Sequence, residues 1–253
     1  MRPALKASSA ASEIRIAALS REEEFREAVA LQKSIWNFDD SNAIPVRFFF
    51  VAARIGGQIF GAYDRDRMVA FCLAVPGVSA TGQPFLHSHM LGVVPEFRGR
   101  GIAFQLKMLQ REDALQRGIG FVEWTFDPLQ LGNAHFNIER LGATVSSYVR
   151  NQYGSCFDAV SGGLRSDRCV AEWRLDSARV KAVLRGESVP GEIQRRIEVP
   201  ADIGVIRRTD SQRAQEIQDR VAMEFEAAFR SGLTVTGLDL TSAEGTYLLG
   251  AAA

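Results

Sequence analysis

Residues 87–103 decide the fold, and they read HSHMLGVVPEFRGRGIA. An apolar run ends at Pro95, an Arg/Gly-rich turn follows, and an amphipathic segment begins at Ile102, so the pattern predicts a strand, a tight loop and a helix. Gly99 and Gly101 allow a sharp turn and a close approach of the backbone to a ligand. The N–H groups of the first helical turn favour an anion, so we expect a phosphate site here.

This loop differs from the two common glycine-rich phosphate motifs. It lacks the Gly-Lys-Ser/Thr of a nucleotide-triphosphate loop, and its spacing is not Gly-x-Gly-x-x-Gly. It does fit Arg98-x-x-Gly101-x-Ala103 after a Val-x-Pro strand end, and in this it resembles the GNAT superfamily of acyl-CoA-dependent N-acetyltransferases. The alternative interpretation is a solvated basic turn between a strand and a helix.

A second segment, in the same order as in that family, supports the resemblance. The predicted strand 121–126 is followed by NAHFNIERLGA at 133–143, which looks like the family's Asn-rich coenzyme-binding helix with Gly142 as a left-handed cap. The resemblance covers roughly residues 14–176. It implies a GNAT-like α/β (α+β) fold, in which helices flank a mixed, mostly antiparallel central sheet.

The resemblance also implies a cofactor, acetyl-CoA or another short acyl-CoA. The loop would hold its pyrophosphate, and the preceding strand would bind its pantetheine arm. The positions that match the family's cofactor site are Leu91, Gly92, Val93, Arg98, Gly99, Arg100, Gly101, Ile102, Ala103, Asn133 and Asn137.

Two histidines precede this site on the same predicted strand. Acyl transfer needs a neutral nitrogen, whereas a free alkylamine is almost wholly protonated at pH 7. His87 and His89 are alternate residues, so both project from one face of the strand, and an imidazole is suited to accept the amine proton. The string His-x-His-x-Leu-x-Val before Phe-Arg-x-x-Gly also resembles the arylalkylamine N-acetyltransferases, whose paired strand histidines are assigned as general base. The alternative is a pair of hydrogen-bonded histidines near the sheet surface.

Further candidates for the site lie after residue 120. Asp127 could orient a base or bind a substrate ammonium, although a turn cap beside a proline is the competing interpretation. Trp124 lies beside the expected cofactor site and is a candidate substrate contact. Arg168 could offer its guanidinium to a carboxylate, with a structural Asp–Arg pair as the alternative.

The family's usual general acid is missing from this chain. Most members carry a Tyr four residues before the Gly that ends the Asn-rich helix, and here that position is Ile138. Tyr148 and Tyr153 are the candidates to replace it, although a Tyr in a strand is more often a packing residue.

Composition excludes several classes of protein. The 253 residues include 30 Lys+Arg and 30 Asp+Glu, so there is no basic field to attract nucleic acid or anionic lipid, and we expect neither as a partner. The cysteines, Cys72, Cys156 and Cys169, are too few and too scattered for a disulfide framework or a Cys-x-x-Cys metal site, so no metal is expected. No apolar run spans a membrane and the N-terminus has no signal-peptide core, so a cytoplasmic protein is the expectation.

The pattern along the chain predicts a mobile tail at 1–13, a GNAT-like domain at 14–176 and a small α+β extension at 177–253. The expected helices and strands of the domain are a helix over 20–37 with a capping box at Ser20 and Glu23, a hairpin of 58–63 and 68–75, a strand over 85–94, a helix over 102–118, and strands over 143–151 and 169–175.

The extension is predicted to contain a strand over 196–207, a helix between Asp210 and Gly232, and short strands over 233–240 and 246–249. The helix carries a sustained apolar stripe, which must be buried against the sheet or against a second subunit. A homodimer is therefore one of two expectations.

Together these features predict an acyl-CoA-dependent N-acyltransferase. The acceptor would be a small-molecule amine or an amino acid, and its nitrogen would attack the thioester directly in a ternary complex. Two other functions remain open at this point: a protein N-acetyltransferase, which would share the cofactor site, and a non-catalytic acyl-CoA-binding module, which the missing Tyr favours.

Overall fold

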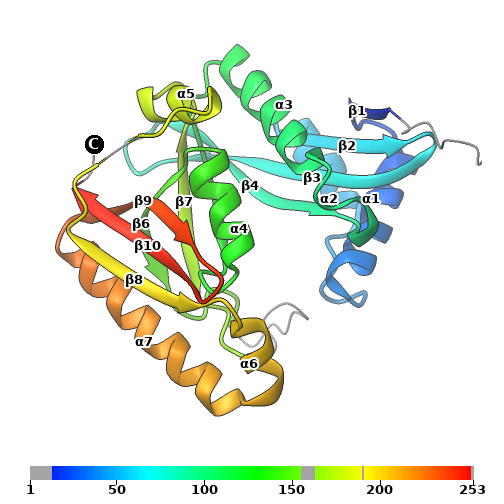
Figure 1. The fold of residues 1–253 in the computed structure, drawn as a ribbon. Coiled ribbons are helices and arrows are strands. Elements are labelled where there is room, and N and C mark those ends of the chain that lie inside the picture. Colours follow the sequence, from blue (N-terminus) through cyan, green and yellow to red (C-terminus); the bar gives the residue numbers. More distant parts are fainter. Residues whose placement is uncertain (1–12, 155–162, 190, 252–253) are drawn as a thin grey trace, which may run out of the picture.

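The computed structural model describes residues 13–154, 163–189 and 191–251. Within these ranges one ten-stranded sheet runs in the order β1-β2-β3-β4-β5-β7-β6-β9-β10-β8 (Figure 1). The strands are β1 (Ile14–Ala18), β2 (Gln58–Asp64), β3 (Arg67–Val78), β4 (Pro84–Val93), β5 (Phe121–Phe126), β6 (Thr144–Val149), β7 (Arg168–Arg174), β8 (Arg195–Pro200), β9 (Leu233–Leu240) and β10 (Glu244–Ala251).

Helices flank this sheet. They are α1 (Glu22–Trp36), α2 (Val46–Arg54), α3 (Ile102–Gln116), α4 (Leu131–His135), α5 (Ala178–Leu184), α6 (Ile203–Thr209) and α7 (Ser211–Arg230). A 3-10 turn, Pro95–Phe97, precedes α3, and a π-helical turn, Phe136–Arg140, continues α4. Of the strand pairings within the described residues, β4–β5 is parallel and the others are antiparallel. The predicted fold class is confirmed.

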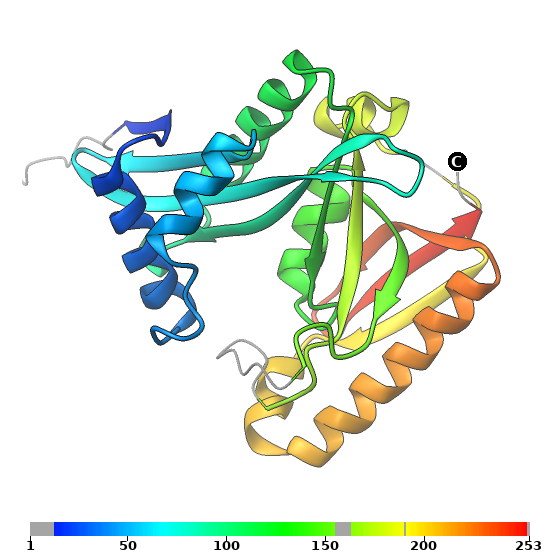
Figure 2. The same ribbon diagram turned by 180° about the vertical axis from the view of Figure 1, so that it is seen from behind.

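Helices cover both faces of the N-terminal strands. Phe71 and Cys72 are consecutive on β3 and therefore point to opposite faces. Phe71 packs against Phe49 of α2, with their ring centroids 6.4 Å apart, whereas Cys72 belongs to a cluster with Leu106 of α3. Figures 1 and 2 show α3 on one side of these strands and α1 with α2 on the other. One face of β2–β4 is thus buried by α3, and the other face is buried by α1 and α2.

The start of α1 corrects a local prediction. The expected capping box joined Ser20 and Glu23, but the carboxylate that accepts the terminal N–H groups is Glu24 Oε2, at 2.9 Å from Ser20 N and 3.0 Å from Arg21 N. The box is therefore displaced by one residue, because Arg21 rather than Ser20 has the extended backbone of an N-cap.

The C-terminal strands extend the same sheet. β9 joins β6 through the pair Val145 and Val235, and β10 and β8 follow outward. Helix α7 packs its apolar stripe against this part of the sheet, and its Phe225 lies 5.0 Å from Tyr247 of β10, ring centroid to centroid. Both belong to the core cluster that also contains Trp173 of β7. The boundary expected at residue 176 stays a prediction, since this core is continuous across it.

One segment differs from the expectation for this region, and the predicted N-terminal tail lies almost wholly outside the described residues. Residues 203–207, expected as strand, form most of α6, because the strand ends at Pro200 and Ile203 and Ile206 bury one side of a short helix. Asp210 caps α7 as predicted, accepting from Arg213 N at 3.0 Å. The predicted tail lies outside the described residues apart from position 13.

Candidate active site

The central feature of the site is the point where β4 and β5 separate. They pair only at Leu86 with Val122 and at His87 with Glu123. Beyond these pairs β4 stays bonded to β3, and β5 stays bonded to β7. The facing edges of the two strands therefore carry backbone N–H and C=O groups that no strand of the described residues pairs, and such groups are available to an extended, amide-rich ligand.

A β-bulge shapes β4 at this point. Leu73 pairs with Met90 and Ala74 with Ser88, which leaves His89 as the extra residue. The Ser88 side chain points toward α3, where its hydroxyl accepts a hydrogen bond from Lys107. His87 and His89 lie together on the opposite face, with their ring centroids 5.8 Å apart. The structure thus brings the two predicted histidines side by side where the strands part.

The two imidazoles have different surroundings. His87 Nδ1 lies 3.3 Å from Glu123 Oε1 on β5, and both side chains are partly exposed. His89 is exposed, and its pKa is lowered from its ordinary value, chiefly because protein atoms around the ring displace water that would solvate its charged form, and secondly because His87 is adjacent. From the sequence, Glu123 is only the next base to consider, together with Asp127, if both histidines are structural. The sequence signal for it is a single carboxylate inside the apolar strand FVEWTF.

The Arg/Gly loop leads into α3 as predicted. Gly101 is the N-cap of the helix with φ of 78°, Gly99 has φ of 76°, and a Cβ at either position would meet no atom within 4 Å. No side chain caps this helix end, and its first turn contains no acidic residue. The arginines are anchored on the loop, since Arg98 Nε donates to Val93 O and Arg100 Nη2 donates to Glu96 O. The amides and guanidinium groups suit a diphosphate.

The Asn-rich helix contributes a buried amide. Asn137 lies in the π-helical turn, is 2% exposed, and its Nδ2 has no hydrogen-bond partner among the described residues. Asn133 is exposed on α4, and Ile138 is fully buried. Buried polar groups in native proteins are nearly always hydrogen-bonded, so an unpaired amide donor indicates a ligand that accepts from it. Single π-helical turns are also frequent at functional sites.

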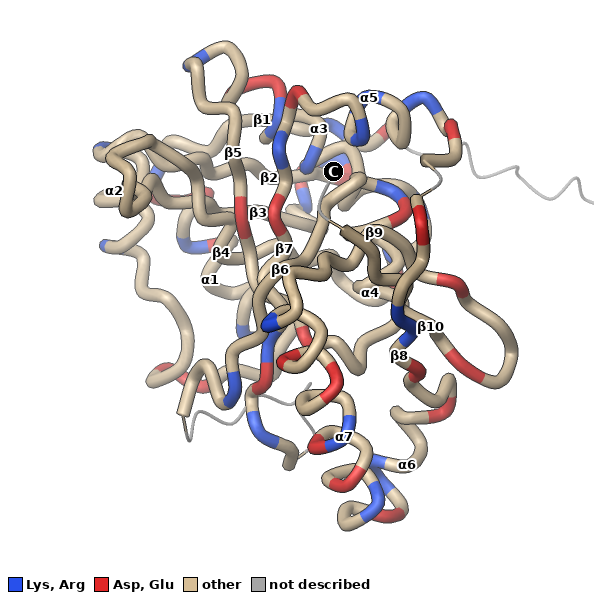
Figure 3. Tube along the Cα trace, turned by 90° about the vertical axis from the view of Figure 1, so that its left-hand side faces the viewer, with Lys and Arg blue, Asp and Glu red and all other residues tan. Residues whose placement is uncertain are grey.

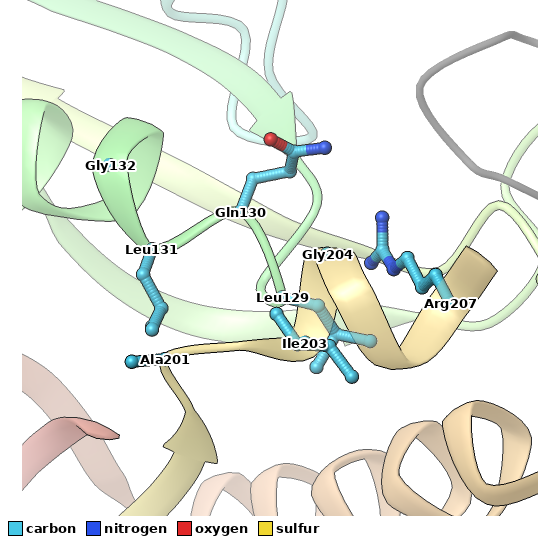
Figure 4. Close-up of a pocket in the computed structure, with 8 residues that line it drawn as sticks. All are labelled: Leu129, Gln130, Leu131, Gly132, Ala201, Ile203, Gly204 and Arg207. Atoms are coloured by element: carbon cyan, nitrogen blue, oxygen red, sulfur yellow. The ribbon is translucent and has the colours of Figure 1, made fainter. Parts of the chain in front are cut away.

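Asp127 lies away from the histidines. Its Oδ1 accepts from Leu129 N at 2.8 Å, and its Oδ2 forms a buried ion pair with Arg207 of α6, also at 2.8 Å. It is four residues farther along the chain than Glu123, roughly 13 Å at the rise of a strand. A cavity of about 220 Å³ adjoins this ion pair between the β5–α4 turn and α6 (Figure 4). It is lined by Leu129, Gln130, Leu131, Gly132, Ala201, Ile203, Gly204 and Arg207.

Trp124 points to the α3 side of the sheet, away from the histidines. Its ring lies beneath Lys107, whose Nζ is 3.6 Å from the ring centroid. Lys107 is 3% exposed and donates to Ser88 Oγ at 2.9 Å and to Gln110 Oε1 at 3.0 Å. Burial lowers the pKa of Lys107 to about 7.

Arg168 and the two candidate tyrosines lie on and beside β6 and β7. Arg168 is buried, donates from Nη1 to Asp167 O, and places its guanidinium 5.3 Å from the centroid of the Tyr153 ring. The Tyr153 hydroxyl is 2.9 Å from Thr125 Oγ1, on the exposed side of β5. Tyr148 donates to Asp167 Oδ2, and burial raises its pKa well above the ordinary value. Of the two tyrosines, Tyr153 is the more exposed.

Other surface features are unremarkable for a ligand-binding protein. Lys and Arg are interspersed with Asp and Glu over the whole trace (Figure 3). Within the described ranges, no helix combines the length and apolarity needed to cross a bilayer. No three His, Cys, Asp or Glu side chains in the same ranges gather closely enough to hold a metal ion.

Comparison with known proteins agrees with this geometry. Residues 19–143 match the model of the acetyltransferase (GNAT) family. No curated protein matches the chain. Among solved structures, an N-acetyltransferase from Staphylococcus aureus Mu50 is 15% identical, with 65% of this chain and 100% of that one covered and a TM-score of 0.52.

Two further structures align over a similar extent. The ribosomal-protein-S18-alanine N-acetyltransferase of Escherichia coli is 15% identical, with 66% of this chain and 96% of that one covered and a TM-score of 0.50. The NatC complex bound to Gag peptide and CoA is 14% identical, with 64% and 98% covered and a TM-score of 0.52. At these identities the likeness shows a shared fold.

Proposed function

The chain belongs to the GNAT family of acetyltransferases through residues 19–143, and from this premise we propose that it transfers an acyl group from acyl-CoA to the amine of a small molecule. Acetyl-CoA is the expected donor. The observation that carries the proposal is the uncapped N-terminus of α3 directly after the separated edge of β4, with two histidines on the other face of that strand.

Three parts of the chain would hold the donor. The amides of residues 99–103 and the guanidinium groups of Arg98 and Arg100 would bind the pyrophosphate. The edge of β4 over 91–93, where Val93 O already accepts from Arg98, would bond the pantetheine amides through its remaining backbone groups, and Asn137 Nδ2 would donate to the same arm. Bound acyl-CoA supplies the thioester carbonyl that the amine attacks.

The acceptor would approach from the histidine face. There His87 or His89 takes the proton from the ammonium, directly or through one water, so that the nitrogen arrives neutral. We assign acceptor contacts to this face rather than to Trp124, which faces α3, or to Asp127, which is engaged by Arg207. A general base of this kind contributes about 10²–10⁴-fold to a rate.

The function is tested by turnover with acetyl-CoA and a panel of small amines, followed as release of free thiol. In the double variant His87→Gln, His89→Gln we expect turnover at pH 7 to fall by about 10²–10⁴-fold while affinity for acetyl-CoA stays nearly unchanged. Higher pH should restore part of the rate, because more of the amine is already neutral. His135→Gln is the matched control and should retain the wild-type rate.

The other outcomes identify the competing functions. Turnover of peptide N-termini but of no small amine would make the protein an N-terminal acetyltransferase of proteins. Binding of acetyl-CoA without turnover of any amine or peptide would leave a non-catalytic acyl-CoA-binding module. A wild-type rate in the double variant would return both histidines to a structural role.

A further inference from the structure

Three ionisable side chains stand in a row on the histidine face. His87 of β4 is in register with Glu123 of β5, and Glu123 is in register with Glu172 of β7. All three are partly exposed, with 28%, 29% and 20% of the respective side chains accessible. Glu123 therefore lies between an imidazole on one side and a second carboxylate on the other.

The pairing of Glu123 with Glu172 is electrostatically unfavourable. Like charges directly opposite each other on neighbouring strands destabilise a sheet. Glu172 has partners of its own, since it accepts a hydrogen bond from the Ser146 hydroxyl and lies 3.5 Å from Arg174 Nη2. Within the described residues, the interaction recorded for the Glu123 carboxylate is with His87. A proton on His87 would place a positive charge beside Glu123 and would offset the repulsion between the Glu123 and Glu172 carboxylates.

We propose that Glu123 is a positioning residue that holds His87 through Nδ1 and thereby makes His87, rather than His89, the group that takes the amine proton. The proposal rests on the acyltransferase function proposed above. Nδ1–H donates to the carboxylate, which fixes the neutral tautomer and leaves the Nε2 lone pair to accept a proton. The same carboxylate stabilises the imidazolium once it has formed.

The proton balance follows from this arrangement. The substrate ammonium gives one proton to His87 Nε2, which later releases it to solvent. The neutral nitrogen then forms a bond to the thioester carbon, and the carbon–sulfur bond breaks. The second proton leaves the nitrogen as the amide forms and ends on the sulfur of the released thiol. Glu123 remains ionised throughout.

His89 has no equivalent of this carboxylate among the described residues. Its pKa is lowered by desolvation of the ring and by the adjacent His87, so His89 is a poorer proton acceptor than an ordinary imidazole. The charged groups around His87 are Glu123 and then Glu172 from β5 and β7, while its neighbour on β3 is the apolar Val75. Lys107 lies on the opposite face of the sheet, where it donates to the Ser88 hydroxyl.

The first test needs no acceptor. The chain has three histidines, so ¹⁵N-detected spectra of the imidazole rings are assignable with the single variants His89→Gln and His135→Gln. We expect His87 as the Nδ1–H tautomer. Glu123→Gln should lower the His87 midpoint by about 0.5–1 pH unit. Glu172→Gln, the matched carboxylate one strand away, should move it by less than half as much.

The second test uses turnover. The acid limb of the pH profile of kcat/KM should move to lower pH in Glu123→Gln by the same amount as the midpoint, with kcat reduced about tenfold and KM for acetyl-CoA unchanged. Glu123→Asp, which keeps the charge, should return the limb toward its wild-type position. Glu172→Gln should leave the limb near that position.

Three results would overturn the proposal: an Nε2–H tautomer of His87 in the wild-type protein, an unmoved His87 midpoint in a folded Glu123→Gln variant, or an equal shift in Glu172→Gln. Failure of the proposed function has a different signature. In that case acetyl-CoA is not bound or no amine is turned over by the wild-type protein, while the ring spectra still report on the Glu123–His87 pair.

Discussion

The ammonium group of Lys107 is buried inside the protein. A buried ammonium is costly unless it is paired, and the contacts of Lys107 Nζ within the described residues are a hydroxyl, an amide oxygen and the faces of Trp124 and Trp173. These contacts offset part of the free-energy cost of desolvating the ammonium. The remaining cost favours loss of its proton. At the scale of single residues, this is the strongest conflict between burial and charge in the structure.

That conflict predicts a pH-dependent stability. The pKa of Lys107 is about 7 in the folded protein and near 10.5 when the chain is unfolded. Below about pH 7 both states are charged and the penalty is fully present; between about 7 and 10.5 the folded state binds fewer protons, so stability rises with pH. The free energy of unfolding of the wild type should therefore increase relative to Lys107→Met from pH 7 to 10.

Urea denaturation of both proteins across this range measures the difference. Lys181→Met, at an exposed lysine paired with Asp176, serves as the control and should show no comparable trend. A difference between wild type and Lys107→Met that stays constant from pH 7 to 10 would mean that Lys107 keeps its proton in the folded state.

At the scale of elements, α3 offers a comparison between its two ends. Gly101 before the helix and Gly118 after it both have a left-handed backbone, with φ of 78° and 72°, and at both a Cβ would meet no atom within 4 Å. A side chain at either costs about 1–2 kcal/mol of backbone strain. At Gly101 it would also occupy the space in which the pyrophosphate is expected.

Gly101→Leu should therefore abolish the stabilisation by CoA, whereas Gly118→Leu should keep it. Saturating CoA at 100 times its dissociation constant adds about 2.7 kcal/mol, which a thermal melt resolves. Both variants should lose similar stability without ligand. Equal CoA shifts in the two variants would reduce the loop to a simple turn.

The elements that sequence patterns predict well are those specified locally. The hairpin around Arg65, the Arg/Gly loop and α3 depend on turn residues and periodicity within a few positions, and they form where expected. Helix α2 is not predicted, because it follows Pro45 without a capping side chain and so lacks a local start signal. The bulge at His89 depends on strand pairing, which no local pattern encodes.

The candidate site shows the same division. The Arg/Gly loop and the histidines follow from a contiguous stretch of sequence, whereas the partner of His87 lies 36 residues away and is chosen by the parallel register of β4 and β5. The surroundings of Asp127 depend on Arg207, which is 80 residues distant. Contacts of this range require the tertiary fold.

At the scale of the whole molecule, the ion pair of Asp127 and Arg207 joins the β5–α4 turn to α6. The pair is buried, with side-chain exposures of 10% and 7%, and Tyr247 donates to Pro128 O beside it at 2.6 Å. Removal of one partner of a buried pair costs about 3–5 kcal/mol, because the attraction and the hydrogen bond between the two charges are lost. We expect that loss in the stability of Asp127→Ala.

Urea denaturation of Asp127→Ala provides the measurement, and Glu226→Ala provides the control. Glu226 pairs with Arg150 near the surface, and its loss should cost less than about 1 kcal/mol. The turnover of folded Asp127→Ala should stay close to that of the wild type. A large fall in rate without a fall in stability would instead support Asp127 as a catalytic group.

Truncation tests the continuity of the core. A chain ending at Leu175 would expose the edge of β6 and the core residues that Phe225 and Tyr247 cover. We expect this truncated protein to be insoluble or to associate, as measured by light scattering. A monomeric and fully active truncation would establish residues 14–176 as an independent domain.

The pairing of β6 with β9 also sets an order of events during synthesis. Val145 emerges from the ribosome 90 residues before its partner Val235, which at typical elongation rates is a delay of about 5–18 s. During that interval the edge of β6 that faces away from β7 has no neighbouring strand, and the apolar residues that α7 later covers are exposed. The nascent chain is therefore most vulnerable to aggregation after the candidate acetyl-CoA site has been translated and before β9 arrives, so slow elongation through residues 177–232 would reduce the yield of folded protein.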